Sequence, residues 1–312
     1  MNGSQTHSDL RPDCLNLPSP VTRIHSSLLL EKNIQLYIKR DELIHPVIQG
    51  NKWRKLKYNL LEAKKSGKNT LLSFGGAYSN HLHALAAAGK LYGFNTIGII
   101  RGEAPAELNP SLRDMLEWNM QLEFIRRIDY KQKTSAAFAQ KLKHQFGDVF
   151  LIPEGGNNPA GIKGCGELLH ELDDIYDHIC CEVGSGTMLS SLILHNQQAN
   201  TRFTGFAVMK NQQLEQDIKH TLSQHPAVNT QWQLNHDYHF GGFAKTDSQL
   251  NDFIKDFKRQ HDVQLEPVYS GKMLYGILDL VKNNHYKPGT KILAIHGGGL
   301  QGLRGFADLR QE

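Results

Sequence analysis

The sequence predicts an α/β protein with two domains and open, twisted parallel sheets, and three observations lead to this prediction. Short apolar runs alternate with segments of helical periodicity from about residue 35 to the end of the chain, which is typical of parallel sheets with helices on both faces. Glycine-rich turns follow four of the predicted strands, where such sheets collect their functional groups. The length of 312 residues is sufficient for two domains.

Runs rich in apolar and β-branched residues predict the strands, because such residues suit a pleated, buried surface. The predicted strands cover residues 35–39, 70–74, 95–100, 121–125, 149–153, 178–183 and 291–296. Segments with apolar residues at helical spacing lie between them and predict helices. The predicted helices cover residues 54–65, 81–92, 110–119, 134–146, 160–176, 188–195 and 273–281. In the first helix Leu56, Leu60, Leu61 and Ala63 lie on one side, and Gly93 is expected to end the second.

Composition argues against several classes of protein. The net charge of +4 is mild and the charges are interspersed, so nucleic-acid and membrane binding receive little support. The polar segment 1–14 lacks the apolar core of a signal peptide, and no apolar run approaches the ~20 residues that span a bilayer. The four cysteines form no Cys-x-x-Cys motif, which favours a reduced, cytoplasmic protein. The 16 histidines lack the spacing of metal ligands, so no metal site is expected.

Four glycine turns lie at the carboxyl ends of predicted strands, at residues 75–76, 155–156, 184–186 and 297–299. A single turn of this kind is typical of packing alone. Because the carboxyl ends of parallel strands meet at one edge of a sheet, we expect the four turns to form the rim of one cleft.

Segment 182–188, Glu-Val-Gly-Ser-Gly-Thr-Met, follows an apolar strand and opens an apolar helix. Glycines let the backbone approach an anion closely, and the unpaired N–H groups of a helix start point toward it. Ser185 and Thr187 add hydroxyl donors. The pattern predicts a phosphate site, although it is also typical of a tight strand-to-helix turn. It matches neither a Walker loop nor a complete dinucleotide fingerprint.

Segment 75–81 has the same arrangement of strand, glycine turn and helix start. Either Ser79 or Asn80 suits a helix N-cap, which is one interpretation. The other is a substrate site, in which the N–H groups of residues 79–81 hold a carboxylate favoured by the helix dipole. Ser79 would then present its hydroxyl to the substrate, and Asn80 its amide to a phenolic oxygen.

Lys52 is the first candidate for covalent chemistry, since it lies in segment 49–56 at the mouth of a predicted helix. Lys272 is a rival, but it begins an amphipathic helix, where surface lysines are common. Tyr269 is expected in the turn before that helix, either as a proton donor over the cleft or as a packed core residue.

Four motifs together resemble the 1-aminocyclopropane-1-carboxylate deaminase / D-cysteine desulfhydrase family. They are residues 50–56 (GNKWRKL), 79–81 (SNH), 153–159 (PEGGNNP) and 267–272 (PVYSGK). The resemblance runs in order from about residue 35 to residue 305. It implies a pyridoxal 5′-phosphate enzyme with the tryptophan-synthase-β fold, known as fold type II.

The resemblance also implies roles for individual residues. Lys52 would form the Schiff base with the cofactor, and Asn80 would bind its 3′ oxygen. The phosphate would be bound by the loop of Gly184, Ser185, Gly186, Thr187 and Met188. The expected catalytic residues are Lys52, Ser79 and Tyr269. The expected substrate-binding residues are Ser79, Asn80, His81 and Tyr269.

The chain also departs from the family pattern. Ring-opening members of the family are expected to carry a second tyrosine in the last strand, at the place of Ala294, and glutamine at the place of His81. Both differences favour β-elimination over ring opening. Tyr78 and Thr187 replace a usual glutamine and a usual glycine. The group that faces the pyridine nitrogen is not identified, with His296 and Gln301 as candidates.

We therefore expect a larger, cofactor-binding domain of residues 1–54 and 161–312 and a smaller domain of residues 55–160. The expected reaction converts a small amino acid, with D-cysteine as the leading candidate, to pyruvate, sulfide and ammonia. The alternatives are 1-aminocyclopropane-1-carboxylate deamination, another lyase or racemase with the same cofactor, and a non-catalytic cofactor- or ligand-binding protein. The resemblance further implies a homodimer.

Overall fold

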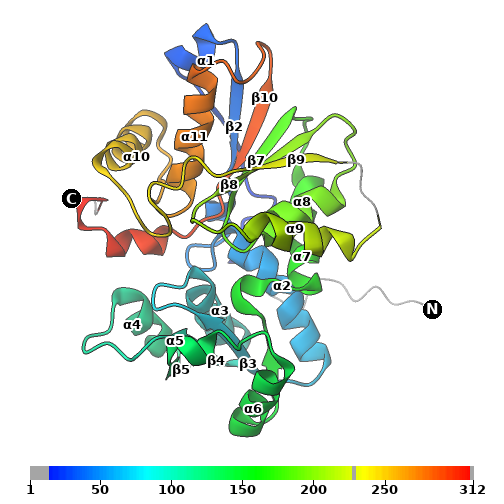
Figure 1. Cartoon of the computed structure of the whole chain (residues 1–312), viewed down its shortest axis with the longest axis vertical. Coiled ribbons are helices and arrows are strands. Elements are labelled where there is room, and N and C mark those ends of the chain that lie inside the picture. Colours follow the sequence, from blue (N-terminus) through cyan, green and yellow to red (C-terminus); the bar gives the residue numbers. More distant parts are fainter. Residues whose placement is uncertain (1–13, 227–229, 310–312) are drawn as a thin grey trace.

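A computed structural model describes residues 14–226 and 230–309 and shows an α/β protein with two sheets flanked by helices (Figure 1). The α/β class expected from the sequence is confirmed. The predicted larger domain includes residues 1–13, 227–229 and 310–312, which lie outside the described residues. The same holds for nearly all of the polar segment at the N-terminus.

The larger sheet has six strands, and all neighbours are parallel except the first pair. In spatial order they are β1 (Val21–Ile24), β2 (Gln35–Lys39), β10 (Lys291–Ile295), β7 (His178–Val183), β8 (Arg202–Ala207) and β9 (Gln231–Asn235). The central strands β10 and β7 are apolar along most of their length because parallel strands inside a sheet are buried on both faces.

The smaller sheet has four strands, all parallel. In spatial order they are β5 (Met120–Ile125), β4 (Asn95–Arg101), β3 (Thr70–Gly75) and β6 (Val149–Leu151). These strands come from the middle of the chain, inside segment 55–160, whereas the strands of the larger sheet lie outside it. The exact domain boundaries stay a prediction.

Helices connect the strands of both sheets, and several begin at a side-chain N-cap. The longer helices are α2 (Gly50–Lys65), α3 (Asn80–Tyr92), α4 (Pro110–Glu117), α6 (Ala136–Phe146), α7 (Pro159–Gly166), α8 (Thr187–His195), α9 (Leu214–Ser223), α10 (Ser248–His261) and α11 (Ser270–Lys282). The side chains of Ser79, Asn109, Ser135, Asn158 and Asp247 each accept a hydrogen bond from the N–H group three residues further on.

Two predicted helices differ from the structure by more than three residues at one end. Helix α2 begins at Gly50, four positions before the predicted start, so Lys52 lies in its first turn. The predicted helix 160–176 is wrong in its second half, because α7 ends at Gly166 and a 3-10 helix follows. Glycine lowers helix propensity. Here it serves close packing, since a Cβ on Gly164 would lie 2.0 Å from the carbonyl oxygen of Arg54 on α2.

Each sheet has an apolar core on both faces. In β10, Ile292 and Ala294 pack with α10 and α11 on one face, while Leu293 and Ile295 pack with α8 and α9 on the other. The smaller sheet packs against α2, α3 and α4 on one face and against α6 on the other. Helices on both faces of parallel sheets are the arrangement that the strand–helix alternation predicts.

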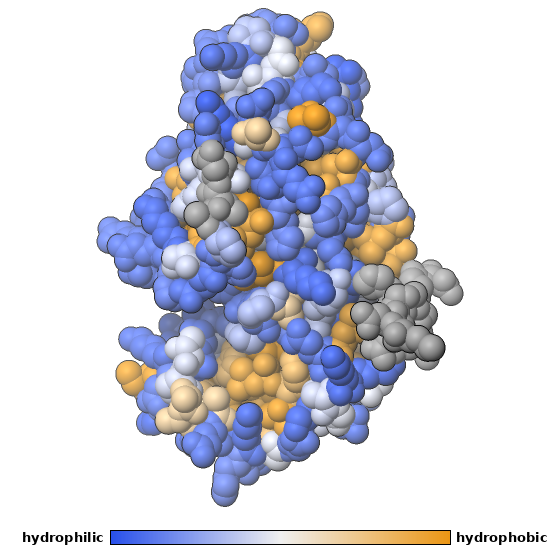
Figure 2. All heavy atoms as spheres, turned by 90° about the vertical axis from the view of Figure 1, so that its right-hand side faces the viewer, coloured by the Kyte–Doolittle hydropathy of each residue, from blue (hydrophilic) through white to orange (hydrophobic). Residues whose placement is uncertain are grey.

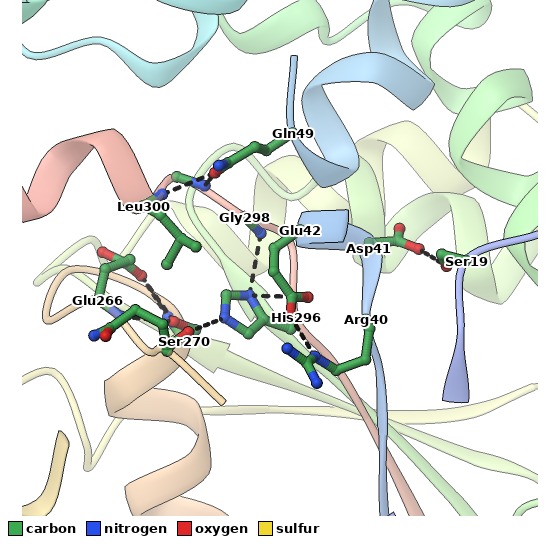
Figure 3. A network of polar contacts seen from close by, with 12 residues as sticks. Ser19, Arg40, Asp41, Glu42, Gln49, Glu266, Ser270, His296, Gly298 and Leu300 are labelled. Carbon is green, nitrogen blue, oxygen red and sulfur yellow. Dashed lines mark hydrogen bonds and ion pairs between the residues drawn. The ribbon is translucent and has the colours of Figure 1, made fainter. Parts of the chain in front are cut away.

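Helix α2 is anchored to the larger sheet by a buried ionic network. Arg54, which is 3% exposed, donates to Asp41 at 2.6 and 2.8 Å and to Glu171 at 2.8 and 2.9 Å. Lys39 also pairs with Glu171 at 2.9 Å. Ser19 donates to Asp41 at 2.6 Å (Figure 3). Burial opposes the shift, but hydrogen bonds from Arg54 and Lys39 lower the pKa of Glu171 to about 2.

The visible surface is largely hydrophilic, with separate hydrophobic patches (Figure 2). Large exposed apolar side chains include Leu30, Ile128 and Ile175. Across residues 14–226 and 230–309, every helix is too short or too polar to cross a membrane. Homodimerisation and a cytoplasmic location stay predictions.

We predict that Arg54→Ala lowers the free energy of unfolding by roughly 3–5 kcal/mol, because it leaves the buried Asp41 and the half-buried Glu171 without their main cation. Urea unfolding followed by circular dichroism measures the change. Arg126→Ala is the matched control, since Arg126 pairs with Asp129 on the surface, and we expect its midpoint to stay at the wild-type value. Equal midpoints for both variants would contradict this account.

Candidate active site

The first turn of α2 is held against the glycine run 297–299. The N–H group of Asn51 donates to the carbonyl oxygen of Gly297 at 3.3 Å. Gly50 adopts a φ of +54°, and a Cβ there would lie 2.2 Å from the same oxygen. Glycine is therefore required at position 50. This contact determines where the Lys52 side chain begins.

The Lys52 amine lies among polar and aromatic groups. Its Nζ donates to Asn51 Oδ1 at 2.5 Å and lies 5.7 Å from the centre of the Tyr269 ring. Burial, followed by the charge of Lys55, lowers the pKa of Lys52 to about 8, although Glu182 and Glu266 oppose the shift. About a tenth of the amine is therefore neutral at pH 7, far more than for an ordinary lysine, and the neutral form is the nucleophile.

The loop 184–188 presents anion-binding groups beside this lysine. Gly186 precedes helix α8 with a φ of +81° and offers no capping side chain, so the first N–H groups of the helix stay available. Ser185 Oγ lies 2.9 Å from Thr187 Oγ1 and 3.5 Å from Lys55 Nζ. Free N–H groups, hydroxyls and a buried ammonium suit a phosphate group. The donor set thus fits the phosphate of pyridoxal phosphate, and Lys52 fits its aldehyde.

The four glycine turns meet around these groups, as their positions after strands predicted. Gly155 lies against Ser185, where an added Cβ would be 3.4 Å from the hydroxyl oxygen. Thr187 Oγ1 also donates to Asn157 at 3.0 Å, which joins the loops 155–158 and 184–188. On the other side, a Cβ on Gly299 would lie 2.5 Å from Asn80 Nδ2.

The turn before α3 brings three predicted residues to the same region. Ser79 is the N-cap of α3 and accepts from the N–H group of Leu82 at 3.2 Å, which leaves its hydroxyl proton available to donate. Asn80 Oδ1 accepts from Gln301 Nε2 at 2.5 Å. His81 is buried, and its Nε2 lies 2.9 Å from the Ser73 hydroxyl. Burial and then the charges of nearby lysines lower the pKa of His81 to about 3, so the ring is neutral.

Tyr269 lies in a turn that a buried carboxylate shapes. Glu266 accepts hydrogen bonds of 2.6–2.8 Å from three backbone N–H groups, those of Val268, Tyr269 and Ser270. The Tyr269 ring meets the Phe243 ring edge-on, with centroids 6.0 Å apart. Burial, followed by the charge of Glu266, raises the pKa of Tyr269. The phenol therefore keeps its proton and can serve as a general acid but not as a base.

Lys272 is not the surface lysine that its helix pattern predicted. Its side chain is 1% exposed, and Nζ donates to the carbonyl oxygens of His239 at 2.9 Å, Gly242 at 2.8 Å and Val208 at 3.3 Å. An ammonium surrounded by three carbonyl oxygens is engaged in structure rather than free for covalent chemistry. Lys272 instead holds the loop that carries Phe243.

Ala294 is fully buried in the apolar core beside α11, and the preference for β-elimination drawn from it stays a prediction. His296 is also engaged in structure, because its Nε2 lies 2.7 Å from the carbonyl oxygen of Gln264 and its Nδ1 accepts from Gly298 at 3.2 Å (Figure 3).

Three residues near Lys52 received no role from the sequence. Lys55 lay inside the motif 50–56 without an assigned function, and Phe243 was missed because it lies in a loop. Glu182, at the end of β7, appeared only as part of the glycine-loop segment. It is 6% exposed and its pKa is raised to about 7, chiefly by burial. In the part of the chain that the structure describes, no group of three or more His, Cys, Asp or Glu side chains is arranged to hold a metal ion.

Comparison with known proteins places these residues in context. A family model described as pyridoxal-phosphate dependent enzyme matches residues 16–298. A protein of Pyrococcus abyssi named putative 1-aminocyclopropane-1-carboxylate deaminase is 29% identical, over 88% of this chain and 87% of its own. The bifunctional D-cysteine desulfhydrase/1-aminocyclopropane-1-carboxylate deaminase, mitochondrial, of Arabidopsis thaliana is 30% identical, over 92% of this chain and 78% of its own.

Among solved structures, the chain is similar to one described as an ACC deaminase homologue. The TM-score is 0.78 at 28% identity, and the match covers 95% of this chain and 93% of the other. The tryptophan-synthase-β-like architecture, fold type II, is thereby confirmed.

The lowered pKa of Lys52 leads to a prediction for the cofactor-free protein. Acetylation of Lys52 by acetic anhydride, followed by mass spectrometry, should speed up about tenfold per pH unit below pH 8 and level off above it, because only the neutral amine reacts. Solvent-exposed lysines should continue to gain reactivity up to about pH 10. A Lys52 profile that matches theirs would contradict the shift.

Proposed function

We propose that the chain, which belongs to the family of pyridoxal-phosphate dependent enzymes, eliminates the thiol of D-cysteine and deaminates the product. The observation that carries the proposal is the half-buried amine of Lys52, whose pKa is lowered and which lies in the region of the loop 184–188 and the Ser79 turn. The names of its relatives, among them a bifunctional D-cysteine desulfhydrase, support the substrate class.

The cofactor would be held at three points. Lys52 would bind its aldehyde, and the loop 184–188 with Lys55 would bind its phosphate. Asn80, whose carboxamide is oriented by the hydrogen bond from Gln301, would bind its 3′ oxygen through Nδ2. When bound, pyridoxal phosphate supplies an electron sink for charge that develops at the substrate Cα.

Residues of the chain bind the substrate and transfer its protons. The first N–H groups of α3 lack helical partners and bind the substrate carboxylate, with Ser79 Oγ donating a further hydrogen bond. Lys52 Nζ, partly neutral at its pKa of about 8, takes the proton from Cα. Tyr269, whose phenol stays protonated, donates to the departing sulfur. Overall, D-cysteine and water yield pyruvate, ammonia and hydrogen sulfide.

A second candidate reaction is deamination of 1-aminocyclopropane-1-carboxylate to 2-oxobutanoate and ammonia. It is favoured by the name of the Pyrococcus abyssi relative and by the second activity in the name of the Arabidopsis thaliana relative. Ala294 and His81, at the places where ring-opening members are expected to carry tyrosine and glutamine, support β-elimination as the first choice.

The first test combines spectrum and product. The purified wild type should show a visible band that borohydride discharges, and Lys52→Ala should lack it because no other amine occupies this position. Among D-cysteine, L-cysteine and 1-aminocyclopropane-1-carboxylate, D-cysteine should give the highest kcat/KM, measured as pyruvate and sulfide. 2-Oxobutanoate from the cyclopropane substrate alone would favour the second candidate, and no product from any of the three would contradict both.

The second test separates a catalytic role of Ser79 from its role as a helix cap. Ser79→Ala should lower kcat on the best substrate by at least tenfold, in addition to about 1 kcal/mol of stability lost with the cap. Ser135→Ala is the matched control, because Ser135 caps α6 through an identical 3.2 Å hydrogen bond outside the site. It should lose similar stability and keep wild-type turnover. Equal turnover in the two variants would remove Ser79 from the mechanism.

A further inference from the structure

Glu182 is a buried carboxylate whose hydrogen-bonding capacity is not used within the described part of the chain. It lies at the carboxyl end of β7, directly before the loop 184–188. Its Oε1 is 3.5 Å from Asn51 Nδ2, at the limit of a hydrogen bond, and its Oε2 has no partner among the described residues. Burial of an unpaired carboxylate is costly. A ligand group that bonds to Oε2 would offset that cost.

The glycine run makes room for this carboxylate. A Cβ on Gly297 would lie 2.0 Å from Glu182 Oε1 and 2.5 Å from Asn51 Nδ2. The carboxylate therefore occupies space that the side chain of any other residue at position 297 would take. It is held beside the residue that precedes Lys52, inside the proposed cofactor site.

Glu182 and Asn80 lie along the same strip of backbone. Gly297 contacts the first and Gly299 contacts the second. The Cα atoms of two residues separated by one other are at most about 7 Å apart. This spacing suits two polar atoms on one aromatic ring, such as the 3′ oxygen and the ring nitrogen of pyridoxal phosphate.

Glu266, Ser270, His296 and Gln301, which lie nearby, already have hydrogen-bond partners. Glu266 accepts from three backbone N–H groups, and the Ser270 hydroxyl donates to Glu266 (Figure 3). Both ring nitrogens of His296 have partners, and Gln301 donates to Asn80. His296 and Gln301 were the candidates for the ring nitrogen, and neither offers a side-chain donor or acceptor as suitably placed as Glu182 Oε2.

We propose that Glu182 pairs with the ring nitrogen of bound pyridoxal phosphate, with one proton shared between that nitrogen and Oε2. The pairing rests on the proposed cofactor site. It needs no further reactant, because the proton only shifts between the two atoms. A carboxylate at this position keeps positive charge on the ring and strengthens its capacity to accept electrons. The raised pKa of Glu182, about 7, is consistent with a carboxyl group that readily holds this proton.

The test compares two cofactors on the full-length, cofactor-free chain. In 1-deazapyridoxal 5′-phosphate a C–H group replaces the ring nitrogen, while the aldehyde, the 3′ oxygen and the phosphate are kept. The wild type should bind pyridoxal phosphate at least tenfold more tightly than the deaza analogue in an absorbance titration. Glu182→Ala should bind the two with nearly equal Kd, because the partner of the nitrogen is gone.

Ser185→Ala is the matched control, since it alters the phosphate loop and leaves Glu182 in place. It should weaken both cofactors by the same factor and keep the preference between them. A second readout is the ¹⁵N chemical shift of ¹⁵N-labelled cofactor. It should report a protonated nitrogen in the wild type and an unprotonated one in Glu182→Gln, a nearly isosteric variant that is expected to fold if Glu182→Ala does not.

The outcomes distinguish an error in the Glu182 pairing from an error in the cofactor site. If Glu182→Ala keeps the tenfold preference, or if the shift is the same in Glu182→Gln and the wild type, the pairing is wrong. The cofactor site then still stands, provided that Ser185→Ala weakens both cofactors. If Ser185→Ala and Lys52→Ala bind pyridoxal phosphate as tightly as the wild type, the site assignment is wrong, and the pairing with it.

Discussion

The contact between the start of helix α2 and the glycine run 297–299 is the constraint on which the site depends. The backbone of Gly297 approaches so closely that Gly50 has no room for a Cβ, and the side chains of Glu182 and Asn51 fill the space beside Gly297. Gln49 strengthens the contact, because its Oε1 accepts from the N–H groups of Gly299 and Leu300 at 3.0 Å (Figure 3). A helix start is thereby fixed against the end of strand β10. The position of Lys52 follows from this junction rather than from the length or flexibility of its own side chain.

Helix α2 also joins the two sheets. Its first turns are tied to the larger sheet by Arg54, which binds the buried Asp41 and the half-buried Glu171. Further along, Leu56 and Leu60 belong to the apolar core of the smaller sheet. The Ser79 turn and the loop 184–188 therefore follow strands of different sheets, and both sheets are joined to the same helix. The preorganisation that a catalytic site requires has its origin in this helix.

Buried charges of both signs surround Lys52. Lys55 lies beside Ser185 near the start of α8, which suits an anion, while the carboxylates of Glu182 and Glu266 oppose the effect of Lys55 on Lys52. Glu266 is satisfied by backbone N–H groups, and His81 is neutral. The charge balance leaves the Lys52 amine close to its titration point near neutral pH. Such an arrangement is costly for stability and typical of a functional site.

The sequence by itself determined the local elements, the glycine turns and the lysine at a helix start, because these depend on neighbours in the chain. With the four motifs it also determined the family and the fold type. Only the tertiary structure decided that residues 167–171 leave the α-helix, that Lys272 is buried and that Ala294 faces the core. It alone brought Glu182 to Gly297 and Phe243 to Tyr269. Those outcomes depend on residues far apart in the chain, and local periodicity holds no information about which distant backbone or side chain will occupy the neighbouring space.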